Sequence, residues 1–409
     1  MFSPVMSTGR KRLYIVIAAV LALWAAILVA LNLTVIPDTY WYSYYAIDYT
    51  VGFVRRGLAG ELVGLLPLDS FDQQRVGRWV SSIAFYCALA VLAWWIAVRS
   101  GRSERRWQVA LLIVVLPFGF GFGLLQAGAT LYGGTALIFF GIAVAAAKSN
   151  RGIFTASAIF GAVSIVLVLV HEAIPLLFGL GVVAVLVVLA EQLGGKALWA
   201  NFALALGPGL VTAAIVAVFG RHGVSDELCA LIPHAQVNNP LAGKPTLQQL
   251  LNGFRYYDDY HDWACRNITP FYNRDFMDGI RYVGRLGVAG MLVNTVYGIG
   301  VLAIAIVAIA RVSGVGPQRI WMLLRRNWIP VTMALCMTVP VFMTGVDWVR
   351  WWVSITLDIG VTYLLYASTQ PEIDTAPTRR STRDFVIAVV LLALIPVGIV
   401  PAFMAPLPI

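Results

Sequence analysis

The sequence predicts an all-α polytopic membrane protein, with one membrane domain covering residues 1–409. Apolar residues make up 60% of the chain and charged residues only 12%, which is too little charge for an ordinary soluble surface. Eleven apolar stretches count as spans, and because several are shorter than the roughly 20 residues a crossing helix needs, tilt or re-entrance near 108–147 is an alternative. The expected spans are about 13–36, 79–98, 108–123, 131–147, 153–170, 174–190, 198–219, 286–310, 328–345, 352–368 and 384–403.

The charges separate when the connections between these spans are assigned alternately to the two faces of a membrane. One face takes 17 of the 29 basic residues and five of the 20 acids, whereas the other takes 12 basic residues and 14 acids, with Asp358 left inside a span. The positive-inside rule makes the first face cytoplasmic. With eleven spans, the amino end is then cytoplasmic and the carboxyl end extracytoplasmic, as expected for a protein of a bacterial inner membrane. The net charge of +9 thus reflects topology and does not indicate nucleic-acid binding.

Two long polar segments fall on the predicted extracytoplasmic side, residues 37–78 and residues 220–285. The cytoplasmic connections are short and basic, and they hold no group of side chains suited to catalysis. The chain has no Gly-rich nucleotide loop or metalloprotease signature, which argues against an ATP-driven transporter or a kinase. Cys229 and Cys265 both fall in the second segment, where an oxidising exterior favours a disulfide over two free thiols.

The first polar segment combines acids, paired arginines and many aromatic residues. Its Tyr and Trp side chains favour the headgroup level of a membrane, which predicts short helices on the outer surface. Arg55 and Arg56 offer fork-shaped donors that suit phosphate, and Asp48 or Asp38 is a candidate general base for a nearby hydroxyl. In the alternative interpretation, the aromatic residues form an interfacial belt and the arginines contact lipid headgroups or pair with Asp48 and Glu61.

Two tight polar corners interrupt the apolar runs. His171 and Glu172 lie between two spans, and ionisable residues at membrane depth are functional candidates by default. His171 is a candidate base or phosphate donor, with Glu172 beside it as a second catalytic candidate; the alternative is that both stabilise a helix end. Asp347 and Arg350 fall one helical turn apart and share a face. Either they neutralise each other, or Arg350 is a third phosphate ligand with Asp347 beside it.

The second polar segment contains a stretch rich in aromatic and acidic side chains. Sugar-binding surfaces use this mixture, because rings stack on pyranose C–H groups and carboxylates accept hydroxyl hydrogen bonds. Tyr257 and Trp263 are the candidate sugar contacts, although a packed soluble cap would have the same composition. His222, His234 and His261 also lie here with acids close by, but their spacing matches no compact zinc motif, so a metal site is an alternative that the sequence does not favour.

The arrangement resembles the GT-C superfamily, multi-span glycosyltransferases that take a sugar from a polyprenyl-phosphate donor at the outer face of the membrane. The likeness is architectural and covers most of the chain: a cytoplasmic amino end, a long acidic first outer segment, and a bundle of spans with a second outer loop. It implies that an acid of the first outer segment is the base and that arginines hold the lipid phosphate. Asp38 has the position of such acids, just past the first span, whereas Asp48 is grouped with Arg55 and Arg56 and ranks first.

The predicted function is therefore transfer of a sugar from a polyprenyl-phosphate-linked donor to a glycan or glycolipid acceptor of the cell envelope. Fixed positive charge from Arg55, Arg56 and Arg350 would stabilise the leaving phosphate without a metal or another cofactor. O-antigen polymerases and ligases are a close alternative, since they too have a large outer loop and outward arginines. A transporter or flippase is the alternative of another class, because Asp358 and the glycines within 119–134 would suit a polar path with broken helices.

Overall fold

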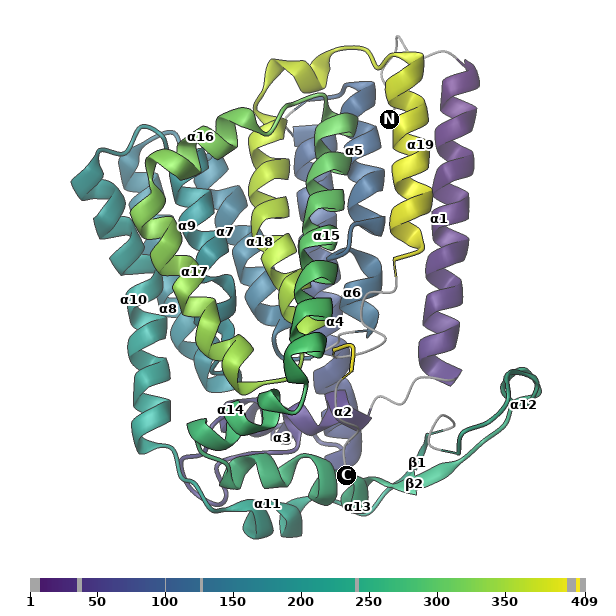
Figure 1. The fold of residues 1–409 in the computed structure, drawn as a ribbon, viewed down its shortest axis with the longest axis vertical. Coiled ribbons are helices and arrows are strands. Elements are labelled where there is room, and N and C mark those ends of the chain that lie inside the picture. Colours follow the sequence, from purple (N-terminus) through teal and green to yellow (C-terminus); the bar gives the residue numbers. More distant parts are fainter. Residues whose placement is uncertain are drawn as a thin grey trace.

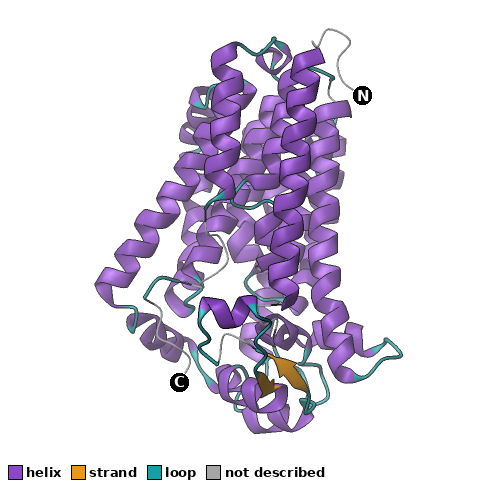
Figure 2. Ribbon diagram, turned by 90° about the vertical axis from the view of Figure 1, so that its right-hand side faces the viewer, coloured by secondary structure: helices purple, strands orange, loops and turns teal. Residues whose placement is uncertain are grey.

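The computed structural model describes residues 8–34, 39–99, 101–125, 128–239, 243–395 and 402–404. Long helices lie side by side in a bundle, and consecutive long helices alternate in direction (Figure 1). The described residues of both polar segments, within 39–69 and 220–286, therefore lie at the same end of the bundle, which we call the site end. Short helices and a two-stranded hairpin make up much of this end (Figure 2).

The apolar helices follow the apolar stretches of the sequence. In chain order they are α1 (Thr8–Thr34), α4 (Ser70–Trp94), α5 (Glu104–Val115), α6 (Phe120–Leu125), α7 (Leu131–Ala146), α8 (Asn150–Val170), α9 (Ile174–Leu189), α10 (Gly195–Phe219), α15 (Gly287–Ser313), α17 (Trp328–Thr344), α18 (Trp348–Ser368) and α19 (Arg379–Ala393). The elements of the site end are α2 (Thr39–Tyr42), the 3-10 turn η1 (Ser43–Tyr45), α3 (Gly57–Gly64), α11 (Ser225–Leu231), β1 (Gln236–Asn238), α12 (Leu247–Leu251), β2 (Tyr257–Asp259), α13 (Tyr260–Asn267), η3 (Thr269–Asn273) and α14 (Phe276–Gly284). The remaining elements are the π-helical turn η2 (Trp95–Arg99), α16 (Gln318–Arg326) and η4 (Pro371–Asp374).

Six of the described helices are long and apolar enough to cross a membrane, and the count is seven if α16 and α17, bent by 90°, form one broken span. Two shorter apolar helices, α7 and α9, add to the bundle. The structure thus supports a helical membrane protein with six to seven candidate spans, while eleven crossings and the direction of insertion stay predictions.

The centre of the bundle is formed by α9 and α18, which pack against each other. Helix α9 is apolar on every face and buried along nearly its whole length, as expected for a helix without a polar side. Helix α18 is also mostly buried, although it carries Arg350 and Asp358. Gly181 of α9 makes room for Asp358, because a Cβ at Gly181 would lie 2.7 Å from Asp358 Oδ1.

The first polar segment is shorter and better packed than the sequence predicts. Helix α4 begins at Ser70 and not near residue 79, since the Asp69 side chain caps it by accepting a hydrogen bond from Asp72 N. The expected surface helices α2 and η1 pack against α4, so Trp41, Tyr44 and Tyr45 are buried. In the interfacial-belt interpretation these rings would contact lipid headgroups, so their burial argues against it.

Candidate functional site

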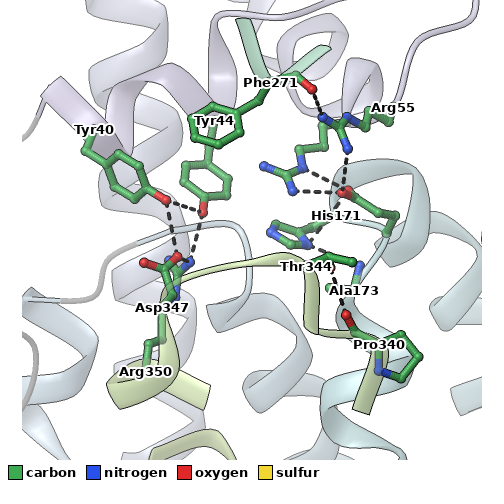
Figure 3. A network of polar contacts seen from close by, with 12 residues as sticks. Tyr40, Tyr44, Arg55, His171, Ala173, Phe271, Pro340, Thr344, Asp347 and Arg350 are labelled. Carbon is green, nitrogen blue, oxygen red and sulfur yellow. Dashed lines mark hydrogen bonds and ion pairs between the residues drawn. The ribbon is translucent and has the colours of Figure 1, made fainter. Parts of the chain in front are cut away.

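Three turns of the chain meet at the site end (Figure 3). They are α2 with η1, the turn between α8 and α9 that carries His171, and the turn between α17 and α18 that carries Asp347. Each turn contributes polar side chains that the sequence analysis selected one by one. The structure therefore joins candidates that are more than a hundred residues apart along the chain.

Arg56 and Glu172 form a two-point ion pair in this cluster. Arg56 Nε donates to Glu172 Oε2 at 2.8 Å and Arg56 Nη2 donates to Oε1 at 2.7 Å, the two-point geometry that suits a guanidinium and a carboxylate. Arg56 has a φ of 65°, a left-handed conformation that costs a residue with a Cβ on the order of 1 kcal/mol. Arg55 also reaches this carboxylate, with its Nη1 3.9 Å from Glu172 Oε1, while its Nη2 donates to the Phe271 carbonyl and its guanidinium lies 5.0 Å from the ring centre of Tyr272 (Figure 3).

The ion pair fixes the charge of Glu172. Burial alone would raise the pKa of this carboxyl group, but the Arg56 charge, the Arg56 hydrogen bonds and the Arg55 charge together hold the pKa well below its ordinary value. A carboxylate that is paired and poorly basic is a weak proton acceptor. This geometry favours a positioning role for Glu172 over the catalytic role predicted from the sequence.

His171 is buried and electrically neutral. Burial, followed by the Arg56 charge, lowers its pKa well below the ordinary range. Ala173 N donates to His171 Nδ1 at 3.2 Å, so the neutral ring carries its hydrogen on Nε2 by this hydrogen-bond pattern. In this tautomer His171 can donate a hydrogen bond to an anion but has no free basic nitrogen, which favours the phosphate-donor alternative over the general base.

Arg350 lies on the Asp347 side of the cluster, and the residue is only 3% exposed. One of its nitrogens, Nη2, donates to Asp347 and to the Tyr44 hydroxyl, the latter at 3.2 Å. The other two, Nε and Nη1, are buried and have no hydrogen-bond partner among the described residues. Because buried donors are nearly always satisfied, two open donors on one guanidinium indicate a place for an acceptor that comes from elsewhere.

Tyr44 lies between the Arg56–Glu172 pair and the Asp347–Arg350 pair. It was not among the site residues predicted from the sequence. Its ring stacks on His171 at 5.5 Å and lies 5.5 Å from the Arg56 guanidinium carbon and 6.0 Å from that of Arg350. Tyr40, also missed, donates its hydroxyl to Asp347 at 3.3 Å. The aromatic density of the first polar segment was the available signal, but its pattern alone does not separate a buried hub from a surface belt.

Asp48, the acid ranked first as the base, forms no described hydrogen bond or ion pair with the residues of this cluster. Asp48 Oδ1 accepts a hydrogen bond from Thr50 N at 2.9 Å, a local turn contact, and among the described residues it forms no ion pair with either Arg55 or Arg56. Asp38 lies outside the described residues, and it directly precedes Thr39, the first residue of α2. The structure therefore does not show the predicted grouping of Asp48 with Arg55 and Arg56.

The candidate sugar contacts belong to the second polar segment. Tyr257 lies on β2 and is exposed, whereas Trp263 of α13 is partly buried against a small apolar cluster. Cys229 of α11 and Cys265 of α13 are bonded to each other, which ties this segment together next to the hairpin. These residues form a separate part of the site end.

An apolar groove of about 760 Å³ reaches the same turn between α17 and α18. It runs between α15 and α17 over α18, with residues of α14 at one end and of α16 at the other. Phe342 and Trp348, which flank Asp347 in sequence, both line it. A hydrocarbon chain lying in this groove would reach the turn that carries Arg350.

Together these features define a multi-pass helical membrane protein in which one group of buried polar and charged side chains lies at the site end of the bundle, near an apolar groove. The chain belongs to the family described as "Uncharacterised membrane protein Rv1490", which matches residues 14–393. It is 39% identical over 395 residues, 95% of this chain and 91% of the relative, to "Uncharacterized protein Rv1490" of Mycobacterium tuberculosis and to "Uncharacterized protein Mb1527" of Mycobacterium bovis. No solved structure matches the chain. The family is one of membrane proteins; the likeness to GT-C glycosyltransferases stays a prediction.

Proposed function

We propose that this protein is a membrane glycosyltransferase that takes a sugar from a polyprenyl-phosphate-linked donor and transfers it to a cell-envelope acceptor at the site end. One observation carries the proposal: the buried Arg350 guanidinium has two open donors, Nε and Nη1. A phosphate group supplies acceptor oxygens and negative charge in the geometry that a guanidinium fork prefers. The apolar groove that ends at the same turn suits the prenyl chain of such a donor.

The reaction that these residues suit is a displacement at the anomeric carbon. The acceptor hydroxyl oxygen attacks this carbon while the bond from the carbon to the phosphate oxygen breaks. The hydroxyl proton passes to a carboxylate, and the electron pair of the broken bond leaves on the polyprenyl phosphate. Arg350 would stabilise the charge of the leaving group, and His171 Nε2–H would donate a further hydrogen bond.

Asp38 is the base that we propose. It directly precedes α2, whose Tyr40 and Trp41 contact the Asp347–Arg350 pair, whereas the described contact of Asp48 is with its own turn. This assignment reverses the order predicted from the sequence. Replacing each acid with Asn distinguishes them, because Asn keeps the shape but cannot accept the proton.

The proposed reaction takes place on the extracytoplasmic face. The basic residues concentrate in the connections predicted to lie on the other face, which the positive-inside rule makes cytoplasmic. A reporter fused after Arg106 should read cytoplasmic, and one inserted near Asn239 should read extracytoplasmic. An insertion near Asn239 that reads cytoplasmic would move the proposed reaction to the wrong side for this class of donor.

The decisive experiment measures incorporation of labelled sugar from polyprenyl-phosphate donors, together with donor binding, in membranes that contain the full chain. Arg350→Met should lower turnover by about 100- to 1000-fold, as loss of an oxyanion donor commonly does. Arg281→Met is the matched control, since Arg281 lies at the same end but is exposed and pairs with Asp278. Equal turnover in Arg350→Met and wild type, with the donor bound equally well, would reject the proposal.

Transport is the second candidate, because one specific observation favours it. Asp358 is fully buried in α18, and neither of its carboxylate oxygens has a hydrogen-bond partner among the described residues. Acids inside a membrane bundle often belong to ion or proton paths. An Asp358→Asn variant that keeps sugar transfer but loses movement of a lipid-linked substrate across vesicle membranes would favour transport.

A further inference from the structure

The hairpin of the second polar segment brings together two histidines that are far apart in sequence. Strands β1 and β2 pair antiparallel with Gln236 opposite Asp259, and the Tyr260 N–H donates to the Ala235 carbonyl at 2.8 Å. This pairing sets His234, just before β1, beside His261 in the first turn of α13. The two imidazole rings stack with their centres 4.0 Å apart.

Each histidine of this pair has a carboxylate at its Nδ1 atom. His234 Nδ1 lies 2.9 Å from Asp259 Oδ2, and His261 Nδ1 lies 3.2 Å from Asp262 Oδ1. Asp259 also caps α13, because its Oδ1 accepts a hydrogen bond from the His261 N–H at 2.9 Å. The carboxylate of Asp259 is therefore held in place by the helix and in turn orients the His234 ring.

The separations suit a metal ion once the exposed His234 ring turns out of the stack, so that the ion lies in the planes of both imidazoles. One ligand atom each from His234, His261 and Asp262 can be chosen so that all three lie within 4.8 Å of one another. Two ligands about 2.0–2.1 Å from a tetrahedral zinc ion are about 3.3 Å apart, close to the 3.2 Å between His261 Nδ1 and Asp262 Oδ1. A metal at this position would replace the proton shared by these two atoms, which is how ligand sets of this kind accept a cation.

We propose that His234, His261 and Asp262 form a zinc-binding site, with Asp259 as the carboxylate that positions His234. Two imidazoles and one carboxylate are a ligand set that zinc uses when a fourth position is open to water. The Asp259 hydrogen bond occupies Nδ1 of His234 and leaves Nε2 for the metal, the arrangement that outer carboxylates give to histidine ligands. This site is independent of the proposed sugar transfer.

The disulfide next to the site decides which atoms are available. His261 Nε2 lies 3.8 Å from Cys229 Sγ and 3.7 Å from Cys265 Sγ. While the two sulfurs are bonded to each other, they offer no thiolate, so zinc takes the Nδ1 side of His261. Reduction would create a different ligand set, made of both thiolates and His261.

The test uses the full-length protein, purified in detergent with its disulfide intact, stripped of metal and then given zinc ion. Element analysis should find one zinc per chain, and competition with a coloured chelator gives the affinity. His234→Gln and His261→Gln should each lose this zinc. Asp259→Asn should weaken binding by about ten- to a hundred-fold, because it removes the positioning carboxylate and no ligand.

His222→Gln is the matched control, since His222 is an exposed histidine of the same segment and belongs to neither cluster. It should bind zinc as wild type does. A count of free thiols in each variant shows that the disulfide and its surroundings have formed. The proposal is overturned if the oxidised protein binds no zinc, if His234→Gln retains it, or if zinc appears only after reduction and vanishes in Cys229→Ser.

Discussion

Arg106 and Arg350 are both buried arginines, at opposite ends of the bundle, and their surroundings differ. Arg106 uses its whole guanidinium: Nε and Nη2 contact Asp374 at 2.7 and 2.9 Å, Nη1 donates to the Ile96 carbonyl, and Nη2 also donates to the Ser368 carbonyl. Arg350 leaves Nε and Nη1 open. Burial and charge are alike, so it is the unmet hydrogen-bonding capacity of Arg350 that distinguishes it from Arg106 and supports the proposal that it binds phosphate.

The largest expected effect tests the structural half of this comparison. Arg106→Met should lower the free energy of unfolding by about 2–3 kcal/mol, because it leaves the ends of two helices without their donor; the half-exposed Asp374 keeps the loss below that of a fully buried pair. Sugar transfer per folded molecule should stay unchanged. Chemical unfolding in detergent measures the first quantity, and a normal stability of Arg106→Met would show that its hydrogen bonds contribute little.

His171→Phe tests the binding half. Phe keeps a ring that can stack on Tyr44 but removes the Nε2–H donor, so donor affinity should fall by about ten-fold or more, the usual worth of a hydrogen bond to a charged group. Stability should fall by only about 1 kcal/mol, because the Ala173 N–H loses its Nδ1 acceptor. Titration with a polyprenyl phosphate gives the affinity, and an affinity equal to that of wild type would remove His171 from the binding site.

Acid should weaken both ends, to different extents. The folded-state pKa of Glu172 is depressed, so the pair with Arg56 contributes stability above the unfolded pKa of about 4.3 and loses it as pH falls, by about 1–2 kcal/mol at pH 3. His171, whose pKa is also lowered, begins the same loss below about pH 6.5. At the other end the Arg106 hydrogen bond lowers the pKa of Asp374, but solvent screens this half-exposed group and its contribution is smaller.

Melting temperatures from pH 7 to pH 3 measure this dependence. Between pH 7 and pH 3, the melting temperature of Glu172→Gln should depend less on pH than that of Asp374→Asn. The opposite order would mean that the pair at the site end is the weaker of the two.

The smallest expected effect concerns Asp48→Asn. Its side chain caps a local turn, and Asn caps such turns as well, so both sugar transfer and stability should stay within about two-fold and about 0.5 kcal/mol of wild type. Asp38→Asn is the paired variant, and it should abolish turnover. If Asp48→Asn abolishes turnover and Asp38→Asn does not, the base is Asp48, as the sequence first suggested.

The apolar runs predicted the positions of the long helices, because a membrane helix is specified by hydropathy over a contiguous stretch. They could not predict where the helices break, as at the 90° bend between α16 and α17, since bends depend on neighbouring helices. The sequence indicated His171, Glu172, Arg56 and Arg350 as separate candidates, and the structure places them in one cluster, while their roles stay predictions. Their pairing was out of reach, because 116 residues separate Arg56 from Glu172.

Asp48 was misplaced for the same reason. The prediction assumed that residues close in sequence are also close in space. In the structure, a local turn directs the Asp48 carboxylate to the Thr50 N–H. The histidine pair shows the converse, since His234 and His261 match no spacing motif and are joined only by strand pairing.

The close approach of Gly181 and Asp358 has a mechanical consequence. A shift of α18 along α9 by about one helical turn would bring the carboxyl group against Leu177 or Val185, which share the face of Gly181 but have side chains that leave no such space. Helices α9 and α18 therefore fit together in a single register. Sliding one helix along the other would cause a steric clash near the middle of the bundle. The core therefore acts as a stiff frame, and larger movements are left to the short helices and turns at the site end.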